Sequence, residues 1–253
     1  MFLAMHRFNS DGVDIAFSDE GEGPPVLLIH GFASNTNVNW RATGWIATLL
    51  AAGHRVIAID NRGHGESEKL YDPLRYTAPD MAEDARRLLD HLDLGQADAM
   101  GYSMGARITA FLAINHPDRV RAAVLAGLAA NMIKGVGEVE ETAQALEADT
   151  LYEIAGARPR AFRVFAEQTK SDRRALAACI RAARVAITPA ALARIKCPVL
   201  VVAGDKDDIA GDVAPLVAAI PGAQGLTLAN RNHMNAVGDM GYKQAVVGFF
   251  GES

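Results

Sequence analysis

The sequence lacks an excess of basic charge and a long apolar run. Its formal net charge is -5 at pH 7, so no overall positive field attracts a polyanion, and nucleic acid is not expected as a partner. No apolar run approaches the roughly 18 residues that a membrane-spanning helix needs. The first residues also lack the basic region and apolar stretch of a signal peptide. We therefore expect a cytoplasmic protein that does not bind a membrane.

Cysteine is nearly absent as well, since the chain has only Cys179 and Cys197. Their spacing matches no metal-binding motif, and two free thiols fit a reducing compartment better than a disulfide does, although a disulfide stays open. The sequence pattern calls for no metal and no organic cofactor, and none is expected.

Apolar residues, in contrast, are abundant. The 253 residues are 50% hydrophobic and 22% charged, which suffices for one large domain, and no internal repeat or low-complexity linker divides the chain. Helical patterns at 77–92 and 103–115 alternate with short apolar runs that indicate buried strands. This alternation predicts an α/β protein with a mostly parallel central sheet and helices on both faces. The apolar runs in the first half of the chain are Val26–Ile29, Val56–Ile59, Ala97–Met100 and Val120–Leu125.

The pattern changes between residues 131 and 188. This alanine-rich stretch is acidic in its first half and basic in its second, and both halves fit helices. Strand patterns resume at 198–202 and again at 224–229. We therefore predict that residues 1–130 and 189–253 form one core domain, and that 131–188 is a small helical cap inserted between two of its strands.

The pentapeptide Gly101-Tyr102-Ser103-Met104-Gly105 follows one of the apolar runs and opens a helical pattern. A G-x-S-x-G sequence in this context is typical of a nucleophile elbow, a tight strand-to-helix turn that exposes the serine hydroxyl. Glycine at the two outer positions lets the strand and the helix approach closely. The string alone is weak evidence in a chain rich in glycine, but its context makes Ser103 the candidate nucleophile.

Attack by a serine on an ester creates an oxyanion, which two backbone N–H groups must stabilise. The residue after the nucleophile, Met104, offers one of them at the N-terminus of its helix. The second should come from the loop after an earlier strand, and the strand that ends in His30-Gly31 makes the Phe32 N–H the candidate. We interpret His30 itself as a structural residue of this turn.

Together these motifs resemble the α/β-hydrolase superfamily in its bacterial esterase form. The resemblance covers nearly the whole chain except 131–188, which in that family is the cap over the active site. It implies a catalytic triad in the chain order serine, acid, histidine. The segments that carry it are His30–Phe32, Asp60–Ser67, the elbow, Cys197-Pro198 with Gly204–Asp207, and Asn232-His233. Of these, Asp60–Ser67 lacks the ending of a phosphate-binding loop, and we interpret it as a structural loop beside the oxyanion region.

The base of the triad has one candidate, because His233 is the single histidine in residues 117–253. The acid is less settled, since Asp205, Asp207 and Asp208 share one loop. The family pattern Gly-x-x-Asp after the strand selects Asp207, and Asp208 is the alternative. The neighbouring carboxylates are expected to cap the helix that starts near Asp212 or to face water.

The resemblance and these residues predict an α/β-hydrolase-fold serine hydrolase, a carboxylesterase that cleaves a small or medium ester or lactone through an acyl-enzyme. The same triad also serves C–C bond hydrolysis, perhydrolysis of carboxylic acids and lyase steps, and a ligand receptor on the same fold is a further alternative. Haloalkane dehalogenases and epoxide hydrolases are excluded by residue type, because both place aspartate where Ser103 stands.

The predicted cap bears on substrate size. Its only aromatic residues are Tyr152, Phe162 and Phe165, so it has no long apolar lid for an oil–water interface, and a small or medium soluble substrate is expected. We expect substitution of these aromatic residues to shift the preference for acyl chain length. The arginines from Arg158 to Arg184 either bind an anionic acyl group or form solvated helix faces.

Overall fold

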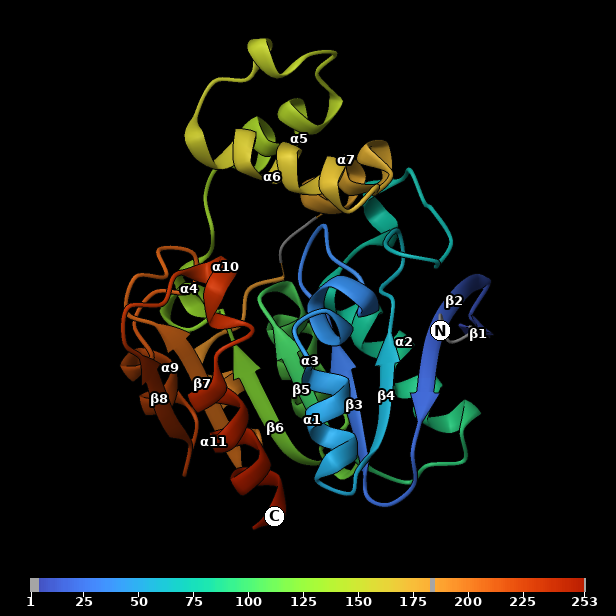
Figure 1. Cartoon of the computed structure of the whole chain (residues 1–253), viewed down its shortest axis with the longest axis vertical. Helices are drawn as coiled ribbons and strands as arrows, with labels where there is room; N and C mark the ends of the chain where they lie inside the picture. Colours follow the sequence, from blue (N-terminus) through green and yellow to red (C-terminus); the bar gives the residue numbers. More distant parts are fainter. Residues whose placement is uncertain (1–4, 183–184, 253) are drawn as a thin grey trace.

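One eight-stranded sheet forms the centre of the computed structural model, which describes residues 5–182 and 185–252 (Figure 1). The strands are β1 (His6–Ser10), β2 (Val13–Glu20), β3 (Pro25–Ile29), β4 (Arg55–Ile59), β5 (Ala97–Tyr102), β6 (Val120–Ala126), β7 (Val199–Gly204) and β8 (Gln224–Leu228). They lie in the order β1-β2-β4-β3-β5-β6-β7-β8. The strands β3 to β8 are parallel to one another, and β2 is antiparallel to both β1 and β4.

The predicted fold class is confirmed, and the six predicted strands are present within two residues at each end. The hairpin of β1 and β2 is an addition that the apolar runs did not predict. Its sequences, HRFNS and VDIAFSDE, mix polar with apolar residues because β1 is an edge strand that buries only alternate side chains.

Helices cover both faces of the sheet. One of them begins as predicted: the Thr77 side chain accepts a hydrogen bond from the Asp80 N–H, and proline occupies the first turn. None of the helices in the described ranges is both long and apolar enough to cross a membrane. The helices outside the β6–β7 connection are η1 (Asn37–Arg41), α1 (Trp45–Ala51), η2 (Pro73–Arg75), α2 (Ala78–His91), α3 (Met104–Asn115), η3 (Pro117–Arg119), α9 (Ala214–Ala219), α10 (His233–Ala236) and α11 (Met240–Gly251).

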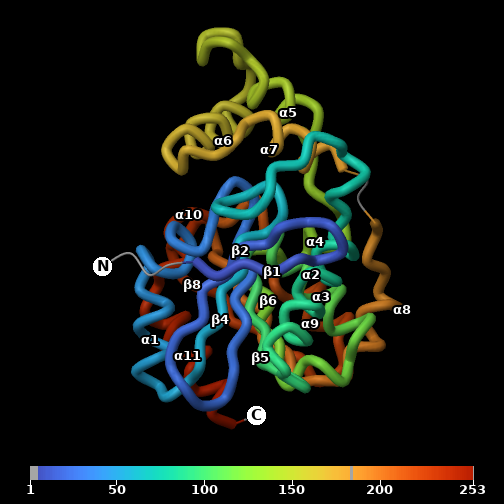
Figure 2. Tube along the Cα trace, turned by 90° about the vertical axis from the view of Figure 1, so that its right-hand side faces the viewer, coloured from blue at the N-terminus to red at the C-terminus, as the bar shows by residue number. Residues whose placement is uncertain are grey.

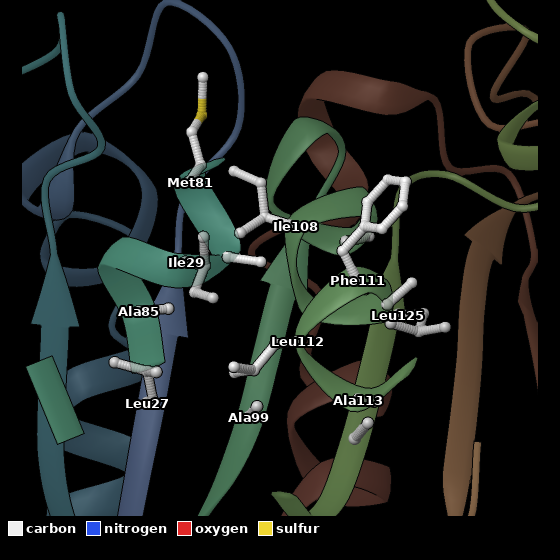
Figure 3. Packing of buried hydrophobic residues seen from close by; sticks show 14 of the residues in the cluster. Leu27, Ile29, Met81, Ala85, Ala99, Ile108, Phe111, Leu112, Ala113 and Leu125 are labelled. Carbon is white, nitrogen blue, oxygen red and sulfur yellow. The ribbon is translucent and has the colours of Figure 1, made fainter. Parts of the chain in front are cut away.

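Successive residues of the central strands are buried on opposite faces of the sheet. In β3, Leu27 and Ile29 join an apolar cluster with α2 and α3, as Figure 3 shows. Val26 and Leu28 join a second cluster with α1 and α11 on the other face. A strand covered on both sides is apolar at nearly every position, which explains why short continuous apolar runs marked these strands in the sequence.

Between β6 and β7 the chain leaves the sheet for residues 127–198, called the inserted segment below. Its described residues form helices and no strand: α4 (Ala130–Lys134), α5 (Val139–Glu147), η4 (Leu151–Glu153), α6 (Ala157–Gln168), α7 (Arg173–Arg181) and α8 (Pro189–Leu192). The helices α5, α6 and α7 lie together above the carboxyl ends of the parallel strands (Figure 1, Figure 2). Because those ends carry the loops after β3, β5 and β7, these helices lie over the candidate site.

The charged residues of the inserted segment bind one another. Arg181, from the basic half, makes ion pairs with Glu140 and Glu147 of the acidic half at 2.9 and 2.7 Å. Arg163 is buried and donates hydrogen bonds to the carbonyl oxygens of Ala145 and Ala148. These contacts hold the acidic first half and the basic second half of the inserted segment together.

The loops after β3 and β4 are joined by a buried histidine. His30 lies against the Gly31 carbonyl through Nδ1, at 2.7 Å, and its Nε2 accepts a hydrogen bond from the Asn61 N–H at 3.0 Å. The ring of His64 lies 5.3 Å from that of His30, and both side chains are fully buried. Burial lowers the pKa of His30 to about 4 and that of His64 to about 3, so both rings are neutral near pH 7.

We expect acid to destabilise the fold through these two histidines. In the unfolded chain they bind protons below about pH 6.5, whereas in the folded protein they stay neutral until about pH 4 and 3. The unfolded state therefore binds more protons as the pH falls from 6.5, and the free energy of unfolding should decrease by roughly 3 kcal/mol or more between pH 7 and pH 4. Urea unfolding at a series of pH values measures this decrease.

The variant His64→Asn provides the control, because an asparagine amide can still donate to the Arg62 carbonyl as His64 Nδ1 does at 2.9 Å. Its free energy of unfolding should depend less steeply on pH between 4 and 6.5 than that of the wild type. Equal slopes for the two proteins would contradict the assignment.

Candidate active site

Ser103 occupies the turn between β5 and α3. Its backbone has φ 56 and ψ -115, a conformation that costs of order 1–3 kcal/mol in a residue other than glycine. A Cβ atom on Gly101 would collide with the Gly105 carbonyl, and one on Gly105 would collide with the Ile29 carbonyl. The two glycines of the motif are therefore required by the close contact of helix and strand.

His233 lies between the serine and a carboxylate. Its Nε2 is 3.1 Å from Ser103 Oγ, and its Nδ1 is 2.9 and 3.0 Å from the two carboxylate oxygens of Asp207. The histidine begins α10, whose first turn is capped by the Asn232 side chain. The Tyr102 hydroxyl, whose pKa is raised by burial, donates to the His233 carbonyl at 2.6 Å. The structure thus brings together the three residues that the sequence proposed as a triad.

Backbone contacts hold the acid loop against the histidine loop. The Asp205 and Lys206 N–H groups donate to the carbonyl oxygens of Leu228 and Arg231, at 3.0 and 2.9 Å. Asp207 itself is buried, and its Oδ1 also accepts hydrogen bonds from the N–H groups of the second and third residues that follow it. These donors fix the carboxylate plane that faces His233.

The other carboxylates of this loop point elsewhere. Asp205 and Asp208 are exposed, and Asp208 pairs with Arg158 of the inserted segment at 3.1 Å. Neither of them caps α9, whose N-cap residue is Val213, and the Asp212 side chain accepts a hydrogen bond from the Ala214 N–H at 2.9 Å just before that helix. Of the carboxylates in this loop, Asp207 is the one that contacts His233.

The loop after β3 forms a tight turn beside the serine. The Ser34 N–H donates to the Gly31 carbonyl at 3.3 Å, and Ala33, inside the turn, has φ 58. Asn39 fixes the start of this turn, because its Oδ1 accepts from the Gly31 N–H at 3.1 Å. A Cβ atom on Gly31 would lie 3.3 Å from Ser103 Cβ, so turn and nucleophile are in direct contact.

The two N–H groups predicted for an oxyanion hole belong to Phe32, in this turn, and to Met104, the first residue of α3. Within the described part of the chain, neither N–H donates a hydrogen bond to another protein group. Phe32 and Met104 are both partly exposed, so two N–H groups without a protein acceptor beside one serine are suited to bind an oxygen of a ligand.

A cavity of about 110 Å³ opens next to Ser103. Core residues line one side of it and the inserted segment lines the other. The lining is mainly apolar and contains no acidic side chain among the described residues. It consists of Phe32, Tyr76, Ala78, Met81, Ser103, Met104, Arg107, Leu128, Val136, Gly137, Thr142, Phe162, Cys179, Ile180, Ala182, Val185 and Ile209.

The lining bears on the aromatic residues and the arginines of the inserted segment. Of its three aromatic residues only Phe162 lines the cavity; Phe165 packs within the inserted segment, and Tyr152 is 96% exposed. The described arginines from Arg158 to Arg181 do not line it. Most of them bind acidic side chains or carbonyl oxygens of the inserted segment and of nearby loops, and Arg174 lies over the Tyr71 ring. Arg184 lies outside the described residues.

Several residues that shape the site were not found from the sequence. Arg107 of α3 lines the cavity and donates to the Met132 carbonyl at 2.9 Å, near the start of the inserted segment. Asn39 and the Tyr102 hydroxyl hold the oxyanion turn and the histidine loop. Tyr102 occupies a position of the elbow motif where any residue is allowed, and Asn39 belongs to no motif. The sequence pattern therefore could not indicate a role for either residue. Cys179 and Cys197 form no disulfide, and Cys179 lines the cavity.

Comparison with known proteins agrees with this geometry. The family model for the alpha/beta hydrolase fold matches residues 24–149, the part of the chain that includes the oxyanion turn and the elbow. A hydrolase from Pseudomonas aeruginosa PA01, known by crystal structure, superposes with a TM-score of 0.80, at 28% sequence identity and over 98% of both chains.

Two curated relatives match about half of the chain. A putative non-heme haloperoxidase from Mycobacterium phage D29 is 38% identical over 122 residues, which are 48% of this chain and 42% of the relative. A 2-hydroxymuconate semialdehyde hydrolase from Pseudomonas sp. (strain CF600) is 39% identical over 120 residues, which are 47% of this chain and 41% of the relative. The matched region thus spans less than half the length of these relatives. By its family model and its fold, the chain belongs to the α/β-hydrolase superfamily.

Proposed function

We propose that the protein is a serine hydrolase, a carboxylesterase that cleaves a small or medium carboxylic ester or lactone through an acyl-enzyme on Ser103. The observation that carries the proposal is the position of His233, within hydrogen-bond distance of Ser103 Oγ on one side and of the Asp207 carboxylate on the other. A base that is oriented by an acid and in contact with a hydroxyl is the arrangement that activates serine for attack.

The reaction follows from these contacts. His233 Nε2 removes the Ser103 proton while Oγ attacks the ester carbonyl carbon, and Asp207 stabilises the imidazolium that forms. The carbonyl electron pair moves to oxygen, where the Phe32 and Met104 N–H groups stabilise the charge. Collapse of this intermediate expels the alcohol, which takes the proton from His233. Water then attacks the acyl-enzyme by the same route and releases the acid.

The cavity supports a short acyl group. A cavity of about 150 Å³ is large enough to bind benzene, so one of about 110 Å³ suits an acyl chain of about four carbons. The inserted helices, which we interpret as a cap, close the outer side of this cavity through Phe162. A soluble ester with a compact acyl part is therefore the proposed substrate.

A second candidate uses the same residues for C–C bond hydrolysis or perhydrolysis. It is favoured by the names of the two curated relatives, a semialdehyde hydrolase and a putative haloperoxidase. The two candidates are separated by assaying p-nitrophenyl esters alongside peracid formation from acetate and hydrogen peroxide. Faster ester cleavage supports the carboxylesterase.

Replacement of the nucleophile tests the proposal directly. Ser103→Ala should abolish labelling by a fluorophosphonate and lower kcat for p-nitrophenyl butyrate by about 10⁴-fold or more, because no oxygen nucleophile remains. Mass spectrometry of the labelled wild type should find the modification on Ser103. Labelling at another serine, or labelling that persists in the variant, would refute the assignment.

The identity of the acid gives a second prediction. Asp207→Asn should lower kcat by about 10³–10⁴-fold, because an amide stabilises neither the required tautomer nor the imidazolium. Asp208→Asn is the matched control: this exposed residue pairs with Arg158 instead, and its kcat should stay within about tenfold of the wild type. A larger loss of kcat in Asp208→Asn than in Asp207→Asn would show that Asp208 is the acid of the triad.

The cavity generates a third prediction. Phe162→Ala should enlarge the cavity and raise kcat/KM for the octanoate ester relative to the acetate ester by about tenfold, since each added methylene then finds an apolar surface. Tyr152→Ala removes an aromatic ring of the same helical segment that is 96% exposed. It should leave this ratio unchanged, and a similar shift in both variants would argue against the cavity as the acyl site.

A further inference from the structure

The oxyanion turn is packed into the inserted segment. Ala33 is fully buried and belongs to the apolar cluster of that segment, whose other members are Ala143, Leu146, Ala166, Leu176 and Ala177. The neighbouring Phe32 ring makes an edge-to-face contact with Phe162 of α6, with 5.6 Å between ring centroids. The turn that carries one oxyanion donor is therefore enclosed by side chains of α5, α6 and α7.

A specific polar contact accompanies this packing. The Ala33 carbonyl is 3.0 Å from Thr169 Oγ1 and 3.5 Å from Ser171 Oγ, and the two hydroxyls are 2.8 Å apart. Within the described part of the chain, no backbone N–H donates to this carbonyl. The two hydroxyls at the end of α6 are thus its hydrogen-bond donors there.

The Thr169 hydroxyl has one proton and several acceptors within reach, since the Phe165 and Ala166 carbonyls lie at 3.0 and 3.2 Å. Both of these helix carbonyls already accept backbone hydrogen bonds, from the N–H groups of Thr169 and Ser171 at 2.9 Å. A buried carbonyl without a donor is costly, so the proton is best placed on the Ala33 oxygen.

The turn needs such a contact to keep its shape. Ala33 has φ 58, which an alanine rarely adopts, and the bond that closes the turn, from Ser34 N–H to Gly31 O, is long at 3.3 Å. The peptide group that carries the Phe32 N–H is held at its own carbonyl, because Gly31 O accepts a hydrogen bond from His30 Nδ1 at 2.7 Å. The contact at the Ala33 carbonyl holds the far side of the turn, two peptide groups further along the chain. An oxyanion donor is effective only when its direction is fixed before the charge develops.

We propose that Thr169 is a positioning residue for hydrolysis. Its hydroxyl, assisted by Ser171, holds the Ala33 carbonyl and thereby keeps the Phe32 N–H aimed at the oxyanion. The inserted helices thus complete the catalytic geometry as well as enclosing the acyl group. This inference rests on the proposed function and adds to it a residue that lies outside the triad and the two N–H donors.

The test compares Thr169→Val, which keeps the shape of the side chain but removes the hydroxyl, with Thr169→Ser, which restores a hydroxyl. With p-nitrophenyl acetate, and with active sites counted by fluorophosphonate titration, Thr169→Val should lower kcat about tenfold or more and change KM less than twofold. The inhibition constant of a trifluoromethyl ketone, which forms a tetrahedral oxyanion on the serine, should rise by the same factor. Thr169→Ser should recover most of both losses.

Thr150→Val is the matched control, because it removes a hydroxyl of the inserted segment that bonds to Glu153 on the exposed surface. It should leave kcat and the inhibition constant unchanged. Should Thr169→Val fail to fold, Thr169→Ala and the single change Ser171→Ala are measured in the same way.

Each result decides between distinct possibilities. A wild type that neither hydrolyses esters nor reacts with the fluorophosphonate overturns the proposed function itself. A wild type that does both, with unchanged kcat in Thr169→Val, overturns only the role of Thr169. A loss of kcat that Thr169→Ser does not recover, or that also occurs in Thr150→Val, assigns the effect to general disturbance of the inserted segment and likewise overturns it.

Discussion

The close packing of three backbone segments around Ser103 is the constraint on which the rest of the site depends. The first turn of α3 lies so near the end of β3 that a single Cβ atom on Gly105 would collide with the Ile29 carbonyl. The oxyanion turn starts two residues after Ile29, and the serine stands two residues before Gly105. The same contact therefore sets the distance between the nucleophile and the N–H groups that face it.

Two strained residues, Ser103 and Ala33, have positive φ in this small region. Strain of this kind persists only where the surroundings determine the backbone, and polar contacts do so here. The Ser103 N–H donates to the Ala126 carbonyl at 2.7 Å. The loop after β4 is held by the buried ion pair of Arg62 with Asp84, at 2.7 Å. Burial alone would lower the pKa of Arg62, but its hydrogen bonds to Asp84 and the charge of Asp84 raise it, so the guanidinium stays charged.

The sequence predicted the parts of the molecule in which local pattern and tertiary environment agree. Strands buried on both faces are apolar at nearly every position, and the elbow glycines are required by a steric contact, so both are visible in a single sequence. Asp207 was preferred over Asp208 on the family pattern, and the loop geometry gives the same preference because Asp207 is the buried one. Contacts between loops, and the exposure of single side chains in the inserted segment, could not be predicted. The Asn39 side chain accepts from the Gly31 N–H, and Tyr152 points into solvent, and both follow only from how the loops and helices pack.

The inserted segment and the oxyanion turn depend on each other for order. The cluster inside α5, α6 and α7 consists of alanine and leucine, which bury little area, and burial stabilises by only about 25 cal/mol per Å². The ion pair between Arg158 and Asp208 adds little, because its side chains are 29% and 77% exposed and such pairs contribute about 1 kcal/mol at most. Docking on Ala33 and Phe32 therefore adds to the order of these helices, together with the packing of Ala178 and Cys179 of α7 into the main core cluster. Since coupling between two binding events is reciprocal, a tetrahedral oxyanion held by the Phe32 N–H would stabilise the docked helices as much as the docked helices stabilise the oxyanion.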